Sequence, residues 1–280
     1  GDAARAGAAR PGGPASRASP GQHEAMLSYQ HGYHAGNLAD VHKHAALAVL
    51  LAALTAKDKP LSFLESHAGR GLYDLAAPEA AKTGEAAEGV EAALARRALP
   101  DDHPWIRAIA ATRAQHGPSA YPGSPAIARA LLRPADRLHL MELHPQEHAA
   151  LRAALHGPGV HIHRRDGHEG LPALVPPTPR RGLALIDPSY EVKDEYAQAA
   201  RLLLDVHRRW PQGVILLWYP VLDAGMHGEL LRALDAGGVA KPWTEEVRFT
   251  GSRLRMRGSG LVCVNTPYGA EAALQASSAA

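Results

Sequence analysis

Four consecutive residues, Asp187-Pro188-Ser189-Tyr190, carry side chains that suit recognition of a purine amino group. A carboxylate accepts hydrogen bonds from an amino group, and an aromatic ring three residues later offers a flat surface on which a base can stack. The preceding apolar run, residues 183–186, is flanked by Gly and Pro and predicts a strand buried on both faces. Pro188 has no N–H for a sheet and disfavours helix at Asp187, so the strand ends at the carboxylate. A strand closed by a purely structural Asp-Pro turn is the alternative.

Three other predicted strands are followed by glycines or by an acidic residue, which are also typical of ligand-binding sites. Residues 61–64 lead to a turn with Gly69 and Gly71, while Glu142 and Asp166 each follow a strand of their own. Ligands of open parallel sheets bind at the carboxyl ends of the strands, and an acid after the second strand commonly holds ribose hydroxyls. Glycines permit close backbone approach. The phosphate-loop pattern G-x-x-x-x-G-K-[ST] does not occur, so the G-x-G turn alone is a weak signal.

The elements that must position these residues alternate along the chain. Strands are expected at 61–64, 136–142, 160–163, 183–186, 214–220, 245–249 and 260–265, and helices at 38–56, 85–99, 105–115, 125–133, 146–155, 195–210 and 228–236. Residues 121–125 are expected to form a turn with Ser124 as the helix N-cap, and 172–179 a Pro-rich linker. The order predicts an α/β fold: a seven-stranded, mostly parallel, doubly wound sheet closed by an antiparallel hairpin, with a small helical insertion at 74–120.

Composition limits the class of protein. With 280 residues, 46% of them hydrophobic, the chain can bury one substantial core, and we expect one domain over 26–280. Residues 1–25 are mostly Ala, Gly, Pro, Ser and Arg, which predicts a disordered leader. Thirty Lys and Arg face 28 Asp and Glu, a balance that permits an RNA partner without requiring one. A single cysteine, Cys263, excludes an internal disulfide and favours the cytoplasm, and no apolar run reaches the ~18 residues of a membrane span.

Two clusters allow other functions. His31, His34, His42 and His44 could be metal ligands of a hydrolase, although their spacing is not H-E-x-x-H and no Cys pair assists them. His44 also heads an apolar helical stripe, where a hydrogen-bonded core histidine is the simpler interpretation. Three arginines between glycines, Arg253, Arg255 and Arg257, suit a loop that contacts phosphates, or a solvated hairpin.

Taken as a set, the motifs resemble a known family. The strand-end residues resemble those of the S-adenosylmethionine-dependent methyltransferase fold, and Asp187-Pro-Ser-Tyr190 resembles the (D/N)-P-P-(Y/F) motif of amino-methyltransferases. Together with Met26-Leu-Ser-Tyr-Gln-His-Gly-Tyr-His-Ala-Gly-Asn, Ser66-His-Ala-Gly, Tyr121-Pro-Gly-Ser-Pro and Glu142-Leu-His-Pro, the motif is similar to the bacterial 23S ribosomal RNA adenine-N6 methyltransferases. The resemblance extends over residues 26 to about 268 and implies a Rossmann-like class I methyltransferase fold.

The resemblance also implies roles for individual residues. Asp187 would be the catalytic acceptor, Pro188 would present its carbonyl to the target amine, Tyr190 would stack the base, and Tyr29 would contact RNA. Contacts to S-adenosylmethionine are implied for a further set: His44, His67, Ser124, Glu142, Asp166, Gly167 and Asp187. The substrate would be 23S rRNA, either protein-free or in an early assembly intermediate, and the enzyme a cytoplasmic monomer that needs no metal and binds no membrane.

One departure concerns the motif itself, because Ser189 stands where the family pattern has a second proline. The substitution threatens the rigidity of the loop more than the chemistry, since Pro188 is present. DNA adenine and protein glutamine remain alternative targets of the same chemistry, and a non-catalytic RNA-binding module remains an alternative class. That last alternative leaves the strand-end acids unexplained.

Overall fold

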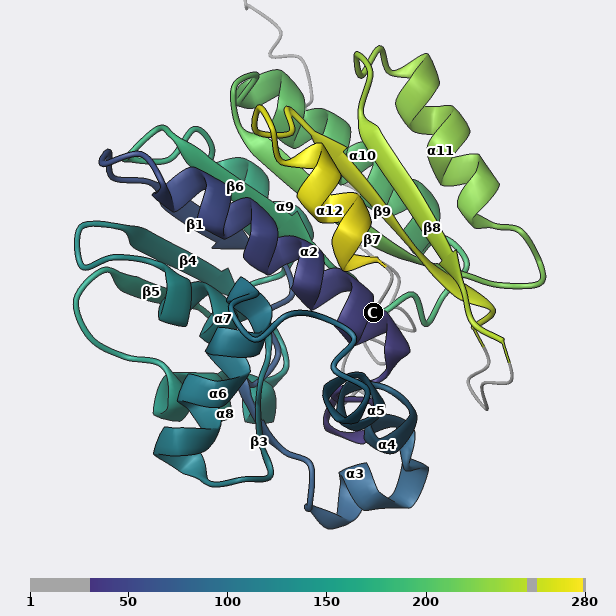
Figure 1. The fold of residues 1–280 in the computed structure, drawn as a ribbon. Coiled ribbons are helices and arrows are strands. Elements are labelled where there is room, and N and C mark those ends of the chain that lie inside the picture. The colour runs from purple at the N-terminus through teal and green to yellow at the C-terminus, as the bar shows by residue number, and fades with distance from the viewer. Residues whose placement is uncertain (1–30, 251–255, 279–280) are drawn as a thin grey trace, which may run out of the picture.

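The computed structural model describes residues 31–250 and 256–278. The leader predicted at 1–25, as well as Tyr29, Arg253 and Arg255, lies outside the described residues. A seven-stranded sheet with the order β5-β4-β1-β6-β7-β9-β8 forms the centre (Figure 1). Its strands are β1 (Ser62–Glu65), β4 (Arg137–Met141), β5 (Val160–His163), β6 (Gly182–Ile186), β7 (Val214–Val221), β8 (Trp243–Arg248) and β9 (Gly258–Val264). Neighbours from β5 to β7 are parallel and β9 is antiparallel to both β7 and β8, so the predicted sheet is confirmed.

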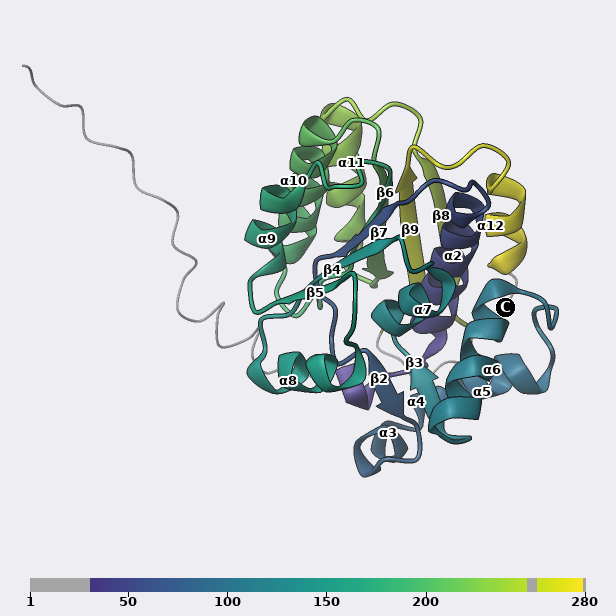
Figure 2. The same cartoon turned by 90° about the vertical axis from the view of Figure 1, so that its left-hand side faces the viewer.

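Helices cover both faces of this sheet (Figure 2). One face packs against α2 (Leu38–Thr55), α7 (Ser124–Leu131), α8 (Pro145–Ala154) and α12 (Glu271–Ser277), and the other against α9 (Gly167–Leu174), α10 (Glu195–Arg209) and α11 (His227–Ala236). Every residue of β6 and β7 is buried, which explains their continuous apolar sequences. Burial on both faces fixes β6 in the middle of the sheet, and its carboxyl end delivers Asp187.

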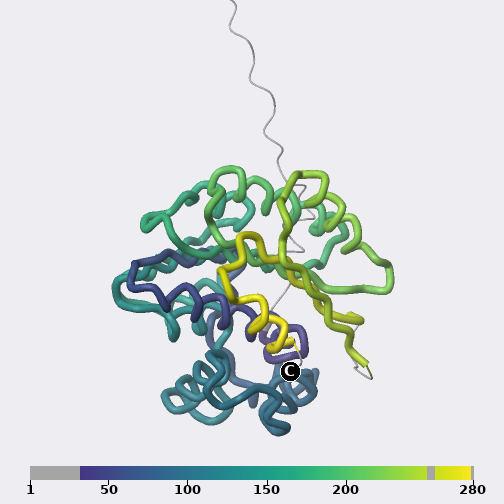
Figure 3. Tube along the Cα trace, turned by 45° about the horizontal axis from the view of Figure 1, so that its top comes forward, coloured from purple at the N-terminus to yellow at the C-terminus, as the bar shows by residue number. Residues whose placement is uncertain are grey.

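A second, smaller lobe lies beside the carboxyl ends of the parallel strands (Figure 3). It contains η1 (His31–Tyr33), α3 (Pro78–Thr83), α4 (Glu85–Glu88), α5 (Val90–Ala95) and α6 (Pro104–His116), and a two-stranded antiparallel sheet of β2 (Leu72–Asp74) and β3 (Ala120–Pro122). Trp105 and Tyr121 are fully buried in an apolar cluster that the lobe shares with α2 and α7. This lobe corresponds to the helical segment expected at 74–120.

The helix predicted over 85–99 is wrong in one respect, because Gly89 divides it into α4 and α5. A Cβ on Gly89 would lie 2.1 Å from the carbonyl oxygen of Gly36, so only glycine permits this contact. Val90 N donates to the same carbonyl at 2.8 Å. The break therefore seats the loop before α2 against the helical lobe.

Several other boundaries differ from the predictions. The first residues of the linker expected at 172–179 belong instead to α9, whose N-terminus is capped by Asp166 and which buries Leu171 and Pro172. Tyr121 was expected in a turn but belongs to β3, and the short helices α3 and α12 were not predicted.

Helix α2 corrects the statement about membrane spans. Within the described residues it is the one helix long and apolar enough to cross a membrane by length and composition. Most of its residues are buried in the protein, as in the core helix of a soluble fold, and polar side chains interrupt its first turns.

Candidate active site

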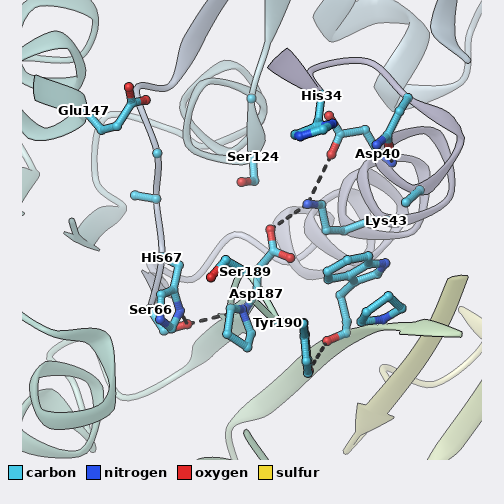
Figure 4. A pocket seen from close by; sticks show the side chains of 18 of the residues that line it. His34, Asp40, Lys43, Ser66, His67, Ser124, Glu147, Asp187, Ser189 and Tyr190 are labelled. Atoms are coloured by element: carbon cyan, nitrogen blue, oxygen red, sulfur yellow. Dashed lines mark hydrogen bonds and ion pairs between the residues drawn. The ribbon is translucent and has the colours of Figure 1, made fainter. Parts of the chain in front are cut away.

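A cavity of about 480 Å³ opens where the parallel strands end (Figure 4). Its size is in the range of small-molecule sites. Side chains and backbone from α2, the loop after β1, the end of β4, the start of α9 and the loop after β6 line it. Of the residues predicted as site residues, it brings together His44, His67, Ser124, Glu142, Gly167, Asp187, Pro188 and Tyr190.

Asp187 lies at the centre of this cavity and forms an ion pair that the sequence did not predict. Lys43 Nζ is 2.6 Å from Asp187 Oδ2 and 3.2 Å from Asp40 Oδ1, and both groups of α2 are almost fully buried. Burial alone would lower the pKa of Lys43, but the two carboxylates outweigh it and raise that pKa above its ordinary value. Lys43 is therefore a permanent cation that holds the Asp187 carboxylate beside an open cavity.

The turn after β1 contributes backbone groups. Gly69 has φ +61°, and its N–H donates to Glu142 Oε2 at 2.8 Å. The other oxygen of Glu142 accepts from His144 N at 2.7 Å. Burial raises the pKa of the Glu142 carboxyl, while these two backbone donors oppose the shift. The predicted glycine turn is thus joined directly to the acid at the end of β4.

His67 lies in the same turn and is uncharged. Its Nδ1 is 2.8 Å from Ser66 Oγ, and its ring packs edge-on against His168 at 5.4 Å between centroids. Burial, followed by repulsion from His168, lowers the pKa of His67 to about 3. A neutral imidazole does not repel a cationic ligand.

The N-cap predicted for Ser124 is wrong. Gly123 is the N-cap of α7, and the Ser124 hydroxyl instead donates to the carboxyl of Glu65, which is fully buried. Burial raises the pKa of Glu65 well above its ordinary value, against the Ser124 hydrogen bond. The pair forms because Ser124 faces the end of β1 and not its own helix.

His44 was interpreted both as a hydrogen-bonded core histidine and as a contact for the cofactor, and its position is compatible with both. Its Nδ1 is 2.7 Å from the hydroxyl of Tyr121, so it is a hydrogen-bonded core histidine, and it also borders the cavity.

Asp166 is placed differently from its neighbour Gly167. The Asp166 carboxylate accepts from His168 N at 2.8 Å as the cap of α9 and does not line the cavity, whereas Gly167 does. A Cβ on Gly167 would be 1.9 Å from the carbonyl oxygen of Ser66, so this position requires glycine.

The Asp-Pro-Ser-Tyr turn forms one wall of the cavity. Tyr190 has φ +55°, a strained value for a residue with a side chain, and its hydroxyl donates to the carbonyl of Trp218 at 2.7 Å. Burial raises the pKa of Tyr190 well above its ordinary value, so the ring remains a neutral phenol. The Ser189 hydroxyl donates to Glu195 Oε1 at 3.3 Å, a tie that partly replaces the rigidity of a second proline.

Of the three predicted loop arginines, only Arg257 is described. Its Nε lies 3.1 Å from both carboxylate oxygens of Asp223, and the side chain is half-exposed and does not line the cavity. Arg257 therefore lies outside the cavity.

The metal alternative has no geometric support among the described residues. In residues 31–250 and 256–278, no three potential ligands lie close enough to hold an ion. The histidines have separate partners instead: His34 contacts Glu85, His42 contacts Ser259 and His44 contacts Tyr121.

The size of the cavity and the residues that line it fit S-adenosylmethionine. Gly69 and Gly167 line the cavity, and a Cβ there would lie 2.6 Å from the Tyr73 hydroxyl and 1.9 Å from Ser66 O, so the packing around the cavity requires glycine at both positions. Glu142 and the neutral His67 line the cavity at the carboxyl ends of the parallel strands, where open α/β sheets bind nucleosides.

A family model, two curated relatives and a solved structure each match most of this chain. The family model described as "Ribosomal RNA large subunit methyltransferase D, RlmJ" matches residues 58–279. Ribosomal RNA large subunit methyltransferase J of Escherichia coli is 37% identical over 247 residues, covering 87% of this chain and 88% of the relative. The Haemophilus influenzae protein of that name is 37% identical over 250 residues with the same coverage. A crystal structure of a Legionella pneumophila protein superimposes with a TM-score of 0.78 at 38% identity, covering 87% of this chain and 91% of that one.

Proposed function

Because the chain belongs to the ribosomal RNA large subunit methyltransferase J family and is an S-adenosylmethionine-dependent rRNA methyltransferase, we propose that it methylates N6 of an adenine in 23S rRNA. The observation that carries the proposal is the position of Asp187 and Pro188, which end a central strand and line the cavity beside the glycine turn.

The cofactor supplies an electrophilic methyl group when it is bound. Glu142 and the neutral His67, on the β1–β4 side of the cavity, are the proposed contacts for its nucleoside part, with Gly167 allowing close approach. Ser124 and His44, on the α2–α7 side, are proposed for its polar amino-acid end. Asp166 would contribute through its backbone, since its carboxylate caps α9.

The catalytic role proposed for Asp187 follows from the chemistry of the amine. The lone pair of adenine N6 is delocalised into the ring, so the nitrogen is a poor nucleophile. Two acceptors, the Asp187 carboxylate and the Pro188 carbonyl, would hold both amino hydrogens and orient the nitrogen. Asp187 then takes the proton as or after the methyl group transfers, because a carboxylate is too weak a base to ionise the neutral amine beforehand.

Lys43 and Tyr190 complete this arrangement. Lys43 fixes Asp187 from the α2 side, so the carboxylate does not reorganise when positive charge develops on N6. Tyr190, held by the Trp218 carbonyl, would stack the base, a contact worth ~1–3 kcal/mol in single-strand binders. The base must leave its stack to reach the cavity.

The remaining expectations concern the contacts to RNA, the cellular location and the oligomeric state. Tyr29, Arg253, Arg255 and Arg257 are proposed RNA contacts outside the cavity. We expect a cytoplasmic monomer acting on protein-free 23S rRNA or an early intermediate. Among the large apolar side chains of residues 31–250 and 256–278, just Tyr33 and Tyr268 are exposed, so these residues present no broad apolar surface that requires a second copy.

The test is methyl transfer from labelled cofactor to protein-free 23S rRNA, followed by digestion and nucleoside analysis. The proposal expects N6-methyladenosine, and little or no transfer to duplex DNA or protein. Label in another nucleoside, or only in DNA or glutamine, would contradict it. Calorimetry with S-adenosylmethionine distinguishes the enzyme from a non-catalytic RNA-binding module, which would release no binding heat.

A further inference from the structure

A buried polar chain runs behind the cavity from β8 to Trp218. The indole Nε1 of Trp218 is 2.8 Å from Ser259 Oγ, and the same hydroxyl is 2.9 Å from His42 Nδ1. On its other side, His42 Nε2 lies 3.6 Å from Glu245 Oε2. The four residues come from β7, β9, α2 and β8, so the chain ties together elements that are distant in sequence.

Donor and acceptor chemistry gives this chain a direction. An indole N–H can only donate, so Ser259 Oγ accepts from Trp218. When His42 Nδ1 is the acceptor, the Ser259 hydroxyl donates to it and the imidazole proton lies on Nε2, which has no hydrogen-bond partner among the described residues and is 3.6 Å from Glu245 Oε2. Ser259 is fully buried and His42 is 4% exposed, so neither can exchange its partner for water. Ser259 therefore joins Trp218 to His42 by two hydrogen bonds, and Glu245 is only an electrostatic neighbour of His42.

The arrangement contains a serine, a histidine and a glutamate, but it is not a hydrolytic triad. Neither Ser259 nor His42 lines the described cavity, and Ser259 has no exposed surface. A substrate could not reach the hydroxyl. These hydrogen bonds therefore hold the Trp218 side chain in place.

That side chain, Trp218, lines the active-site cavity and touches two proposed catalytic elements. Its carbonyl accepts the Tyr190 hydroxyl at 2.7 Å, and its ring meets the Tyr190 ring at 73° with centroids 5.6 Å apart. Its ring also lies 5.2 Å from Lys43 Nζ, as a cation–π contact. The orientation of the indole thus bears on both the stacking ring and the partner of Asp187.

From these contacts we infer that Ser259 and His42 are positioning residues that set the Trp218 wall of the target-base pocket. The inference rests on the proposed function, since it assigns the base to the Asp187–Tyr190 side of the cavity. Neither residue touches the cofactor region, so they affect acceptance of the RNA base and not binding of S-adenosylmethionine.

The test compares Ser259→Ala with Ser62→Ala. Ser62 is also fully buried, and its hydroxyl donates to Pro179 O at 2.7 Å, but it lies at the start of β1 and does not line the cavity. Three quantities are measured: the indole N–H resonance of Trp218, assigned with Trp218→Phe, the cofactor Kd, and the kinetic constants for RNA. The inference expects Ser259→Ala to shift that resonance and raise KM for RNA roughly fivefold to tenfold, about the worth of one of the two hydrogen bonds that Ser259 loses, with cofactor Kd unchanged.

His42 supplies a second pair of variants if Ser259→Ala folds poorly. His42→Asn can keep an acceptor near the Nδ1 position and is expected to retain most of the RNA affinity, whereas His42→Leu is expected to behave like Ser259→Ala. An unshifted resonance, or a KM for RNA no higher than that of Ser62→Ala, would overturn the inference. Because the resonance is read without turnover, a wild-type protein that makes no N6-methyladenosine would refute the proposed function separately.

Discussion

Replacing Lys43 by Met tests how Asp187 is held. The substitution keeps most of the side-chain volume but leaves the Asp40 and Asp187 carboxylates without the cation that lies 3.2 and 2.6 Å from them. Removing one partner of a buried pair costs about 3–5 kcal/mol, and we expect the lower end, since the Asp187 side chain is 12% exposed at the cavity. In a chain of this size, about 3 kcal/mol lowers Tm by roughly 6–12 °C. Methyl transfer should fall as well, because the acceptor is no longer fixed.

The assay is urea unfolding, with a shifted midpoint and an unchanged slope as the sign of a real stability change. Lys57→Met is the matched control: this lysine is exposed just beyond the C-terminus of α2, and the expected effect is within about 0.5 kcal/mol. In an Asp40→Asn background, Lys43→Met should cost at least ~1 kcal/mol less than in the wild type. Equal effects of the two lysine variants, or strict additivity with Asp40→Asn, would refute the proposed ion-pair cluster.

Two further predictions concern Glu65, which is buried behind the cavity-lining Ser124, and Gly167 in the cavity wall. Burial raises the pKa of Glu65 above its ordinary 4.5, so the folded protein binds this proton more tightly and loses stability as pH rises beyond that value. Glu65→Gln should therefore gain stability over the wild type at pH 8 relative to pH 5 in urea unfolding; an equal difference at both pH values would contradict this. Gly167→Ala places a Cβ 1.9 Å from Ser66 O and should weaken cofactor binding at least ~10-fold by calorimetry, while Gly228→Ala in α11 should not; equal affinities would contradict it.

The sequence alone located those site residues whose position follows from the residues next to them in the chain. Asp187 was found because an apolar run and a proline fix both the strand and its end, and β6 matches the prediction within one residue. Glu142 and Gly69 were found for the same reason, since each follows a strand. Their direct hydrogen bond could not be predicted, because it depends on β1 and β4 being neighbours in the sheet.

Lys43 was missed because its proposed catalytic partner is defined only in three dimensions, although Asp40 lies three residues before it in the same helix. Asp187 is 144 residues away along the chain, and the periodicity of α2 directed attention to His44. One signal was present: Lys43 is the single Lys or Arg in the segment 38–56. A single lysine three residues after an aspartate, at the head of a long apolar segment, indicates a buried ion pair, since burying the cation unpaired is costly.

Ser124 shows the opposite error. A serine before a proline is typical of a helix N-cap, and the local pattern was interpreted that way. The hydroxyl instead reaches Glu65, a buried carboxyl on the neighbouring β1. Tertiary contacts decided this position, as they did at Gly89, where packing against Gly36 breaks a helix that composition alone would continue.

The central claim, that Asp187 is the acceptor for the target amine, is tested most directly by single-turnover methylation with Asp187→Ala. Asp205→Ala, on the outer face of α10, is the control for loss of a carboxylate. The account predicts that Asp187→Ala lowers the rate of N6-methyladenosine formation on protein-free 23S rRNA by at least ~100-fold, while the Kd for S-adenosylmethionine stays within roughly threefold of the wild type. An Asp187→Ala enzyme that forms N6-methyladenosine at the rate of the control would contradict it.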